Sequence, residues 1–282
     1  MEISTVGIVG AGLMGSGIAE VCARKGLRTI VTEADQERLD AGRRRVEQSL
    51  ERGRQGGKLS DTDVSRAQEL LEYTLDLESF AQCDVSIEAV VESLPAKVDI
   101  FERLDRIAPE HGILATNTSS LPIIEMARHT TRPERVVGTH FFNPVPVMKL
   151  LEVVRSIATS EDTLEATRSF GERLDKRIIL AQDRGGFIVN LLLIPFLTHA
   201  VRLYESGFAT REDIDDGMRL GCGHPMGPLQ LLDLIGLDTA MYVCESLYEE
   251  YANSDYAPPP LLRRMVAAGY LGRKTGRGFY EY

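Results

Sequence analysis

The segment TVGIVGAGLMG, residues 5–15, joins a short β-branched strand to a glycine-rich turn. We expect a strand over Thr5–Val9 and a helix over Met14–Arg24, because apolar residues recur there at helical spacing. A second strand is expected over Leu27–Thr32. A strand, a helix and a second strand within about 30 residues form the βαβ unit of a parallel sheet.

Three glycines follow the first strand with the spacing GxGxxG, which is typical of dinucleotide-binding folds when a helix comes next. The first glycine permits the turn, the second lets the backbone approach a pyrophosphate, and the third lets the helix pack on the strand. The N-terminus of the helix then offers unpaired N–H groups to the phosphates. We therefore expect the loop to bind a cofactor through Gly10, Ala11, Gly12, Leu13, Met14 and Gly15. An ordinary glycine turn is the alternative.

Glu33 closes the second strand, 18 residues after Gly15. A carboxylate at this position can hydrogen-bond the ribose hydroxyls of a dinucleotide. It also repels a 2′-phosphate, and no Arg follows it directly, so the sequence favours NAD over NADP. A solvated Glu33 with no ligand is the alternative interpretation.

The remaining pattern continues the sheet and then becomes helical. Further strands are expected over Cys83–Val90, Ile113–Thr116, Val136–His140, Leu150–Val154 and Ile178–Leu180. Helices are expected between them over Asp35–Gly53, Lys97–Ala108 and Ile123–Arg128, and from Ser60 and Ser160 onward. After Gly186 the expected elements are the helices Phe187–Glu205, Arg211–Leu220, Leu229–Tyr251 and Leu261–Ala268. The predicted fold class is α/β, with a Rossmann-like doubly wound sheet over residues 1–184 and an all-helical C-terminal domain over residues 185–282.

The composition argues against several classes of protein. The chain is 43% hydrophobic and 26% charged, which is a globular mix, and its net charge of −10 gives nucleic acid no general attraction. The longest apolar run, Phe187–Val201, is too short and too often interrupted to span a membrane. The apolar N-terminal segment lacks the basic residues of a secretory signal. The four cysteines form no CxxC pair, so we expect no metal site and a reducing, cytoplasmic compartment.

His140 and Glu152 are the candidates for proton transfer. His140 ends a predicted strand at the carboxyl edge of the sheet, where such folds bind their ligands. Glu152 lies twelve residues later on the next strand, and the prolines between them could turn the chain back. A returning strand would bring the carboxylate to the imidazole, fix its tautomer and stabilise the imidazolium. The alternative is a surface histidine and an ordinary strand glutamate.

Two further polar positions invite a functional interpretation. The run Thr116–Ser120 follows a strand at the same edge, and its hydroxyls, together with the Asn117 amide, could hold nicotinamide or substrate oxygens. Helix capping explains such residues equally well and is favoured by the sequence alone. Asn190 stands at the start of an otherwise apolar helix, so its amide needs a partner in the protein or in a ligand.

The segment from Arg38 to Lys58 is locally basic, with seven Lys or Arg residues against three Asp or Glu. Such a patch could attract a polyphosphate group on a substrate. A solvated helix face is the alternative, and composition does not choose between the two.

The whole chain resembles the short L-3-hydroxyacyl-CoA dehydrogenases, and especially the bacterial 3-hydroxybutyryl-CoA dehydrogenases. The resemblance runs from end to end, and so many blocks in the same order are far more specific than a single motif. The blocks are VGAGLMG (9–15), IEAVVE (87–92), NTSS (117–120), HFFNPVPVM (140–148), GFIVN (186–190), HPMGP (224–228), LIGLD (234–238) and GRKTGRGFY (272–280).

The resemblance implies roles for individual residues. His140 would be the base for the 3-hydroxyl group, oriented by Glu152. Ser119 and Asn190 would be catalytic residues that contact the substrate and help organise the site. The positions that would touch NAD are Glu33, Glu92, Lys97, Ser119 and Lys274, in addition to the glycine loop and Asn117. The basic hairpin, including Ser49 and Lys58, would lie where the CoA of an acyl-CoA substrate binds. The helical domain would form a homodimer interface, and the substrate would lie in the interdomain cleft.

One departure and three rival functions accompany the resemblance. Leu191 stands where many members carry Arg, so an ion pair that would affect domain closure or chain-length preference is removed. The β-hydroxyacid dehydrogenases, which carry a catalytic lysine on the first helix of their second domain, are disfavoured because residues 187–205 contain no Lys. An NAD sensor without catalysis is disfavoured by the retained site residues. An enzyme for carrier-protein thioesters stays open, as do acyl chain length and the direction of the reaction.

Overall fold

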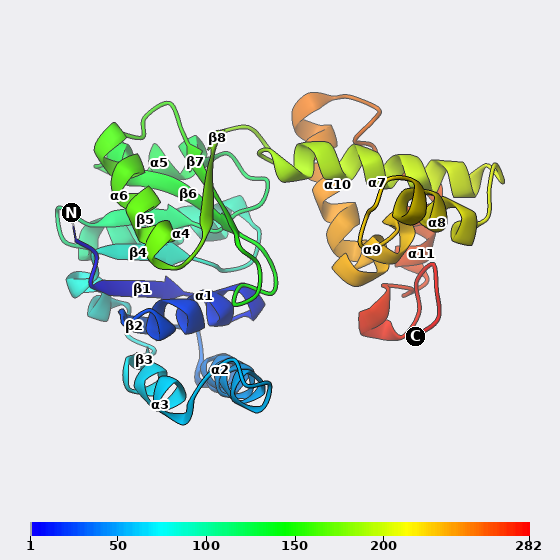
Figure 1. Cartoon of the computed structure of the whole chain (residues 1–282). Coiled ribbons are helices and arrows are strands. Elements are labelled where there is room, and N and C mark those ends of the chain that lie inside the picture. The colour runs from blue at the N-terminus through cyan, green and yellow to red at the C-terminus, as the bar shows by residue number, and fades with distance from the viewer. Residues whose placement is uncertain (1) are drawn as a thin grey trace. The chain divides into compact units, whose positions relative to one another are not determined.

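The computed structural model describes residues 2–282, which divide into two compact units, one ending at Arg184 and the other covering Gly185–Tyr282 (Figure 1). The first unit is built on one eight-stranded sheet with the strand order β3-β2-β1-β4-β5-β6-β7-β8. The strands are β1 Thr5–Val9, β2 Arg28–Thr32, β3 Leu71–Thr74, β4 Val85–Glu88, β5 Ile113–Thr116, β6 Val136–Phe141, β7 Leu150–Arg155 and β8 Arg177–Gln182.

Neighbouring strands of this sheet run parallel, except that β6 and β7 are antiparallel. The chain order proceeds outward from β1 through β2 to β3, and then restarts on the other side of β1 with β4. This reversal makes the carboxyl edge between β1 and β4 a switch point, the place where doubly wound sheets bind ligands. The predicted α/β fold class is confirmed.

Helices cover both faces of the sheet (Figure 1). They are α1 Leu13–Arg24, α2 Gln36–Gln55, α3 Asp61–Glu69, α4 Leu94–Ile107, α5 Ile123–Ala127 and α6 Glu161–Arg173. On one face, Ile18 of α1 and Phe170 of α6 join a buried cluster with Ile8 of β1. On the other face, Gly7 lets the Phe80 ring pack directly on β1, since a Cβ there would lie 2.3 Å from the ring.

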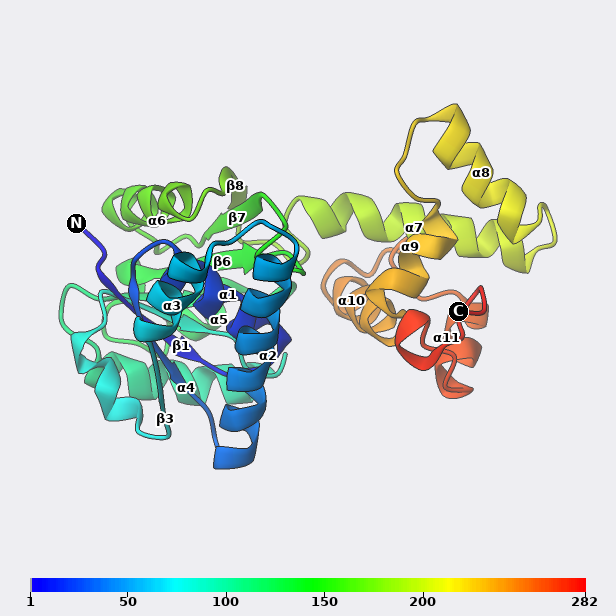
Figure 2. The same ribbon diagram turned by 60° about the horizontal axis from the view of Figure 1, so that its bottom comes forward.

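The helices α2 and α3 form a hairpin beside α1 (Figure 2). The expected cap at the start of α3 is confirmed, because the Asp63 N–H donates to the Ser60 hydroxyl (3.1 Å) and the Ser60 N–H donates to the Asp63 carboxylate (2.9 Å). The edge strand β3, which follows this hairpin, is absent from the sequence prediction. Its four residues show too little alternation of apolar and polar side chains to be recognised in the sequence as a strand distinct from the end of the preceding helix.

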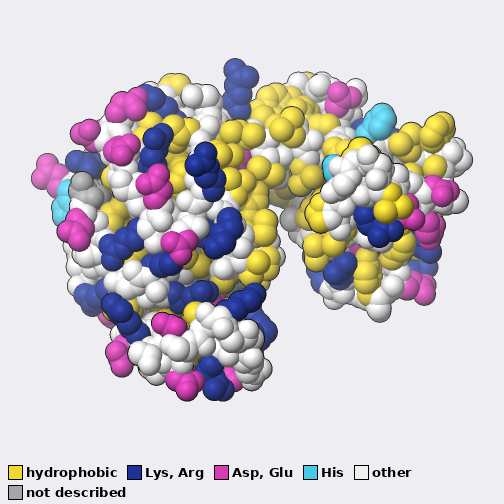
Figure 3. Space-filling model, viewed as in Figure 1, with side chains coloured by type: hydrophobic (Ala, Val, Ile, Leu, Met, Phe, Trp, Pro, Cys, Tyr) yellow, Lys and Arg dark blue, Asp and Glu magenta, His cyan; other side chains and the backbone are white. Residues whose placement is uncertain are grey.

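The second unit is helical, as predicted. Its helices are α7 Val189–Glu205, α8 Arg211–Gly221, α9 Pro228–Ile235, α10 Leu237–Tyr251 and α11 Pro260–Ala267. The single helix expected over Leu229–Tyr251 is wrong, because Gly236 takes a φ of +100° and separates α9 from α10. Figure 3 shows many apolar side chains on the surface of this unit.

The C-terminal tail is fastened to this helical unit by buried carboxylates. Asp233 of α9 accepts hydrogen bonds from the backbone N–H groups of Phe279 (2.8 Å) and Tyr280 (2.9 Å). The Tyr280 hydroxyl donates to Asp215 of α8 (2.8 Å). Burial raises the pKa of Asp233 despite these donors. Among residues 2–282, no helix has the length and apolar character needed to cross a bilayer.

Candidate active site

The glycine loop opens the carboxyl edge of β1. Gly10 has a φ of +99°, and a Cβ at this position would lie 2.6 Å from the Ala89 carbonyl oxygen. A Cβ on Gly15 would lie 1.8 Å from the Gly10 carbonyl oxygen, so only glycine lets α1 begin this close to the strand. A Cβ on Gly12 would meet nothing within 4 Å, which leaves the loop backbone open to a ligand. These three environments correspond to the three functions expected of the motif.

Glu33 lies at the end of β2 and faces the glycine loop. One carboxylate oxygen accepts the Ala11 N–H (2.9 Å) and the other accepts the Ala34 N–H (2.9 Å). Each oxygen can accept a second hydrogen bond. Glu33, Gly12 and Val91 line one hollow of about 840 Å³ along this edge. An open glycine turn and a carboxylate in one hollow of this size fit a dinucleotide.

The loop is also fixed from behind by α2. The Arg45 guanidinium (3.1 Å) and the Ser16 hydroxyl (2.8 Å) both donate to the Ala11 carbonyl oxygen. Gly42 allows this close approach, because a Cβ there would lie 2.3 Å from the Ala11 side chain. Arg45 thus holds the loop, a role that the analysis of local charge does not predict.

His140 and Glu152 are brought together by the antiparallel pair β6 and β7. The two residues lie directly opposite each other in the register. His140 Nδ1 lies 2.6 Å from Glu152 Oε2. Glu152 is fully buried and His140 is 7% exposed, so the two groups meet away from bulk water. Because β6 is parallel to β5, β4 and β1, His140, one residue before the end of β6, lies at the same edge of the sheet as the glycine loop.

Two contacts hold the strands that carry this pair. The Asn117 side-chain oxygen accepts the Phe141 N–H (3.0 Å) and so continues the β5–β6 pairing past the end of β5. Lys176 is buried, and its ammonium donates to the carbonyl oxygens of Val145 (2.5 Å) and Met148 (2.7 Å) in the β6–β7 connection. Burial is the main reason that the pKa of Lys176 lies below its usual value. Asn117, which is predicted to touch the cofactor, contacts the backbone of Phe141 and so holds the strand next to His140 in place.

Ser119 lies in a polar network with the two predicted NAD contacts Glu92 and Lys97. Glu92 Oε1 accepts the Ser119 N–H (2.9 Å) and hydroxyl (3.3 Å), and Glu92 Oε2 lies 3.1 Å from the Lys97 ammonium. Lys97 is 1% exposed and also contacts Glu88 at 2.7 Å. Glu88 belongs to this network, and no role is predicted for it from the sequence. The available signal was a lone acidic residue at the end of an apolar strand.

Other predicted residues belong to separate places in the fold. Asn190 and Lys274 are in the helical unit, Asn190 in the first turn of α7, and the Lys274 ammonium bonds both oxygens of Asp238 (2.6 Å). Ser49 is half-buried in the C-terminal half of α2, and Lys58 is exposed after that helix. Their predicted ligand contacts stay predictions.

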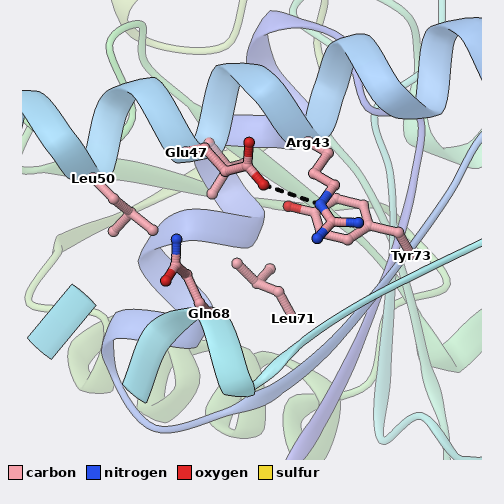
Figure 4. Close-up of a pocket in the computed structure, with 7 residues that line it drawn as sticks. Arg43, Glu47, Leu50, Gln68, Leu71 and Tyr73 are labelled. Carbon is pink, nitrogen blue, oxygen red and sulfur yellow. Dashed lines mark hydrogen bonds and ion pairs between the residues drawn. The ribbon is translucent and has the colours of Figure 1, made fainter. Parts of the chain in front are cut away.

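Much of the positive charge in the basic segment is neutralised locally. Arg38 pairs with Asp35, and Arg54 pairs with Glu51 and Asp61. Arg43 binds Glu47 (3.0 Å) above the Tyr73 ring, beside a hollow under α2 (Figure 4). Burial raises the pKa of Tyr73 to about 12. Arg45 bonds the Ala11 carbonyl oxygen instead of an acid. Within residues 2–282, three basic side chains of this segment have neither kind of partner, namely Arg44, Arg52 and Lys58.

A doubly wound sheet with an open glycine turn and a buried imidazole–carboxylate pair at the same edge defines a dinucleotide-dependent oxidoreductase. Comparison with known proteins narrows this class. The model of the 3-hydroxyacyl-CoA dehydrogenase NAD-binding domain matches residues 5–184, and that of the 3-hydroxyacyl-CoA dehydrogenase C-terminal domain matches residues 186–282. The chain belongs to the 3-hydroxyacyl-CoA dehydrogenase family. It is an NAD-dependent enzyme that acts on a CH–OH group, so the predicted family and cofactor are confirmed.

Individual relatives match over the full chain. A 3-hydroxybutyryl-CoA dehydrogenase of Mycobacterium tuberculosis is 49% identical over 282 residues, covering 99% of both chains. The crystal structure of M. tuberculosis FadB2 has a TM-score of 0.99 at 48% identity and covers 100% of both chains. The (S)-3-hydroxybutyryl-CoA dehydrogenase PaaH1 of Ralstonia eutropha has a TM-score of 0.95 at 44% identity, covering 100% of this chain and 99% of the other.

Proposed function

We propose that this enzyme interconverts a (3S)-3-hydroxyacyl-CoA of short chain, such as 3-hydroxybutyryl-CoA, and the corresponding 3-ketoacyl-CoA. The observation that carries this proposal is the buried contact between His140 Nδ1 and Glu152 Oε2 (2.6 Å) at the NAD-binding edge of the sheet. Oxidation of an alcohol requires one group to take the hydroxyl proton while a hydride leaves the same carbon. The names of the full-length relatives support the choice of a short 3-hydroxyacyl-CoA.

The contact between His140 and Glu152 determines which nitrogen of the imidazole can accept the substrate proton. The Glu152 carboxylate accepts a hydrogen bond from Nδ1–H, so Nε2 keeps the lone pair that a base needs. His140 Nε2 takes the proton of the 3-hydroxyl group, and the buried Glu152 stabilises the imidazolium that forms. Bound NAD supplies the hydride acceptor. In the reverse direction His140 returns the proton to the 3-keto oxygen.

The remaining residues are assigned to binding. Ser119 and Asn190 contact the substrate, while Glu33 and the glycine loop hold NAD together with Asn117 and Lys274. Glu92 and Lys97, which form an ion pair with each other, are assigned to NAD as well, and Glu88 is the second partner of the Lys97 ammonium. Ser49 and Lys58 hold the CoA at the hairpin of α2 and α3, where three basic side chains lack an internal partner within residues 2–282.

The direct experiment is the loss of NADH absorbance when acetoacetyl-CoA is added to the purified enzyme. A series of 3-ketoacyl-CoA substrates would define the chain length, and the same acyl groups on acyl-carrier protein would test the second candidate substrate. Turnover of carrier-bound thioesters alone would contradict the proposal.

Replacement of Glu33 by alanine should weaken NAD binding by about ten- to hundredfold, because hydrogen bonds to a charged acceptor contribute about 1.5–3 kcal/mol. The preference for NAD over NADP should fall as well, since the charge that repels a 2′-phosphate is removed. Binding of both cofactors by calorimetry measures this. Asp35→Asn is the matched control, because Asp35 is a nearby carboxylate that caps α2. Equal use of NADP by the unmodified enzyme would contradict the assignment.

The helical unit is proposed to bind a second copy of the chain. Large apolar side chains are exposed on it, with Leu192 73%, Phe208 78% and Leu220 72% accessible. Such exposure in a unit with its own buried core supports this assignment. We expect sedimentation velocity to give the mass of a dimer, and to give a monomer after Leu192→Glu. A monomeric unmodified enzyme would contradict this assignment.

A further inference from the structure

Glu88 is a buried carboxylate with no assigned function. It is the last residue of β4, beside the switch point, and its exposed fraction is 0%. It accepts hydrogen bonds from the Val90 N–H (2.6 Å), the Thr116 hydroxyl (2.6 Å) and the Lys97 ammonium (2.7 and 3.0 Å). A buried charge is costly unless it is paired and fully hydrogen-bonded. Glu88 meets both conditions, so its strand end is rigidly specified.

Lys97 connects Glu88 to a second carboxylate. This lysine lies in the first turn of α4 and is 1% exposed. An ammonium has three donors, and those of Lys97 lie within reach of both Glu88 oxygens and of Glu92 Oε2 at 3.1 Å. The three groups therefore form a line of charge that runs from the buried Glu88 and Lys97 to Glu92, whose side chain is 21% exposed.

Glu92 ends this line at Ser119. Its Oε1 accepts the Thr118 hydroxyl (2.5 Å), the Ser119 N–H (2.9 Å) and the Ser119 hydroxyl (3.3 Å). Burial opposes ionisation of Glu92, but Lys97 and the donors of Thr118 and Ser119 outweigh it and keep the pKa of Glu92 below its usual value. Glu92 is thus an ionised acceptor, and a serine hydroxyl has only one proton to donate.

We infer that Glu88 is a positioning residue for Ser119, acting through Lys97 and Glu92. Glu88 holds the Lys97 ammonium, Lys97 holds the Glu92 carboxylate, and Glu92 accepts the hydrogen bond that the Ser119 hydroxyl donates. The Ser119 oxygen is then left with its lone pairs, so it receives a hydrogen bond from its ligand and does not donate one. This inference rests on the proposed function, in which Ser119 contacts the substrate.

The test is a double-variant cycle with Glu88→Gln and Ser119→Ala. The glutamine keeps a side chain of similar shape at position 88 but removes its charge. We expect Glu88→Gln to lower kcat about ten- to hundredfold in the unmodified enzyme, the range that a misplaced contact group costs. In the Ser119→Ala background the same change should alter kcat by no more than about twofold, because the group it positions is gone. Equal loss in both backgrounds, or no loss in either, would overturn the inference.

Asp105→Asn is the matched control for a general structural effect. Asp105 lies at the other end of α4, is 8% exposed, and accepts the Arg132 guanidinium (2.8 Å) and the Thr131 N–H (2.8 Å). This variant should lower Tm, with kcat unchanged in both backgrounds. Because Glu88→Gln leaves Lys97 short of an acceptor and can unfold the chain, Glu88→Met with Lys97→Met is the second variant, which removes both charges together. Low kcat with folded protein supports the inference, and kcat equal to that of the unmodified enzyme overturns it.

Different results would contradict the proposed function and the positioning role of Glu88. If the proposed function is wrong, the unmodified enzyme does not consume NADH with acetoacetyl-CoA, or Ser119→Ala leaves kcat unchanged. If only the positioning function of Glu88 is wrong, the enzyme works and Ser119→Ala slows it, while Glu88→Gln acts alike in both backgrounds.

Discussion

Replacement of His140 by alanine should lower kcat about 10³-fold, within the range that a positioned general base contributes. The imidazole lies one residue before the end of β6, at the edge of the sheet that carries the glycine loop, and is the group proposed to take the hydroxyl proton. NADH binding should change by less than about twofold, because a base stabilises the transition state and not the bound cofactor. Steady-state turnover of 3-hydroxybutyryl-CoA and the fluorescence of bound NADH measure the two quantities.

His129 offers a matched control for this variant. It is a second histidine of the same unit that contacts a glutamate, with Nδ1 3.1 Å from Glu102, but the pair lies on the surface. His129→Ala should leave kcat unchanged. Near-normal turnover by His140→Ala would remove the proposed base, and a loss of NADH binding equal to the loss of kcat would show that His140 serves the cofactor.

Glu152→Gln should lower kcat by about 10²-fold while the chain stays folded. Glutamine has the shape of glutamate but no charge, and its amide can present an N–H to Nδ1 in place of an acceptor. The imidazole then loses the partner that fixes its tautomer and stabilises the imidazolium. KM for the acyl-CoA should change little, because fully buried Glu152 is assigned to His140 and not to the substrate.

Turnover and thermal denaturation of Glu152→Gln should be measured together. Unchanged kcat in folded protein would show that the carboxylate has no part in the proton transfer. Glu134→Gln, a change of the same kind in the short turn before β6, is the control for loss of an acidic charge near this strand.

The local parts of the fold were predictable because neighbouring residues determine them. The glycine spacing after Val9 leads directly to the βαβ unit, and the Ser60 cap follows from its own four residues. Gly236 shows where prediction from local sequence stops. A glycine within an apolar helical pattern can continue the helix or break it, and the sequence does not reveal that Gly236 adopts a positive φ. The fold class therefore follows from the pattern, while breaks within helices depend on packing.

The candidate site was only partly predictable. Glu152 could be placed on the strand after His140, but their contact depends on the register of β6 and β7 across a twelve-residue separation. Glu88 was missed because its three donors, the Val90 N–H, the Lys97 ammonium and the Thr116 hydroxyl, come from separate segments of the chain. The expectation for Ser49 derives from the family resemblance alone, while that for Lys58 also rests on the local excess of basic residues. The effect of Leu191 on domain closure or chain-length preference, which the resemblance alone implies, stays a prediction.

The most direct measurement is kcat for the double variant His140→Ala with Glu152→Gln, compared with each single variant. If Glu152 serves the reaction only through the imidazole, the double variant should turn over no more slowly than His140→Ala, within about twofold. Losses that multiply to the product of the two single effects would mean that the two side chains act independently, and would contradict a proton transfer by one carboxylate-backed histidine.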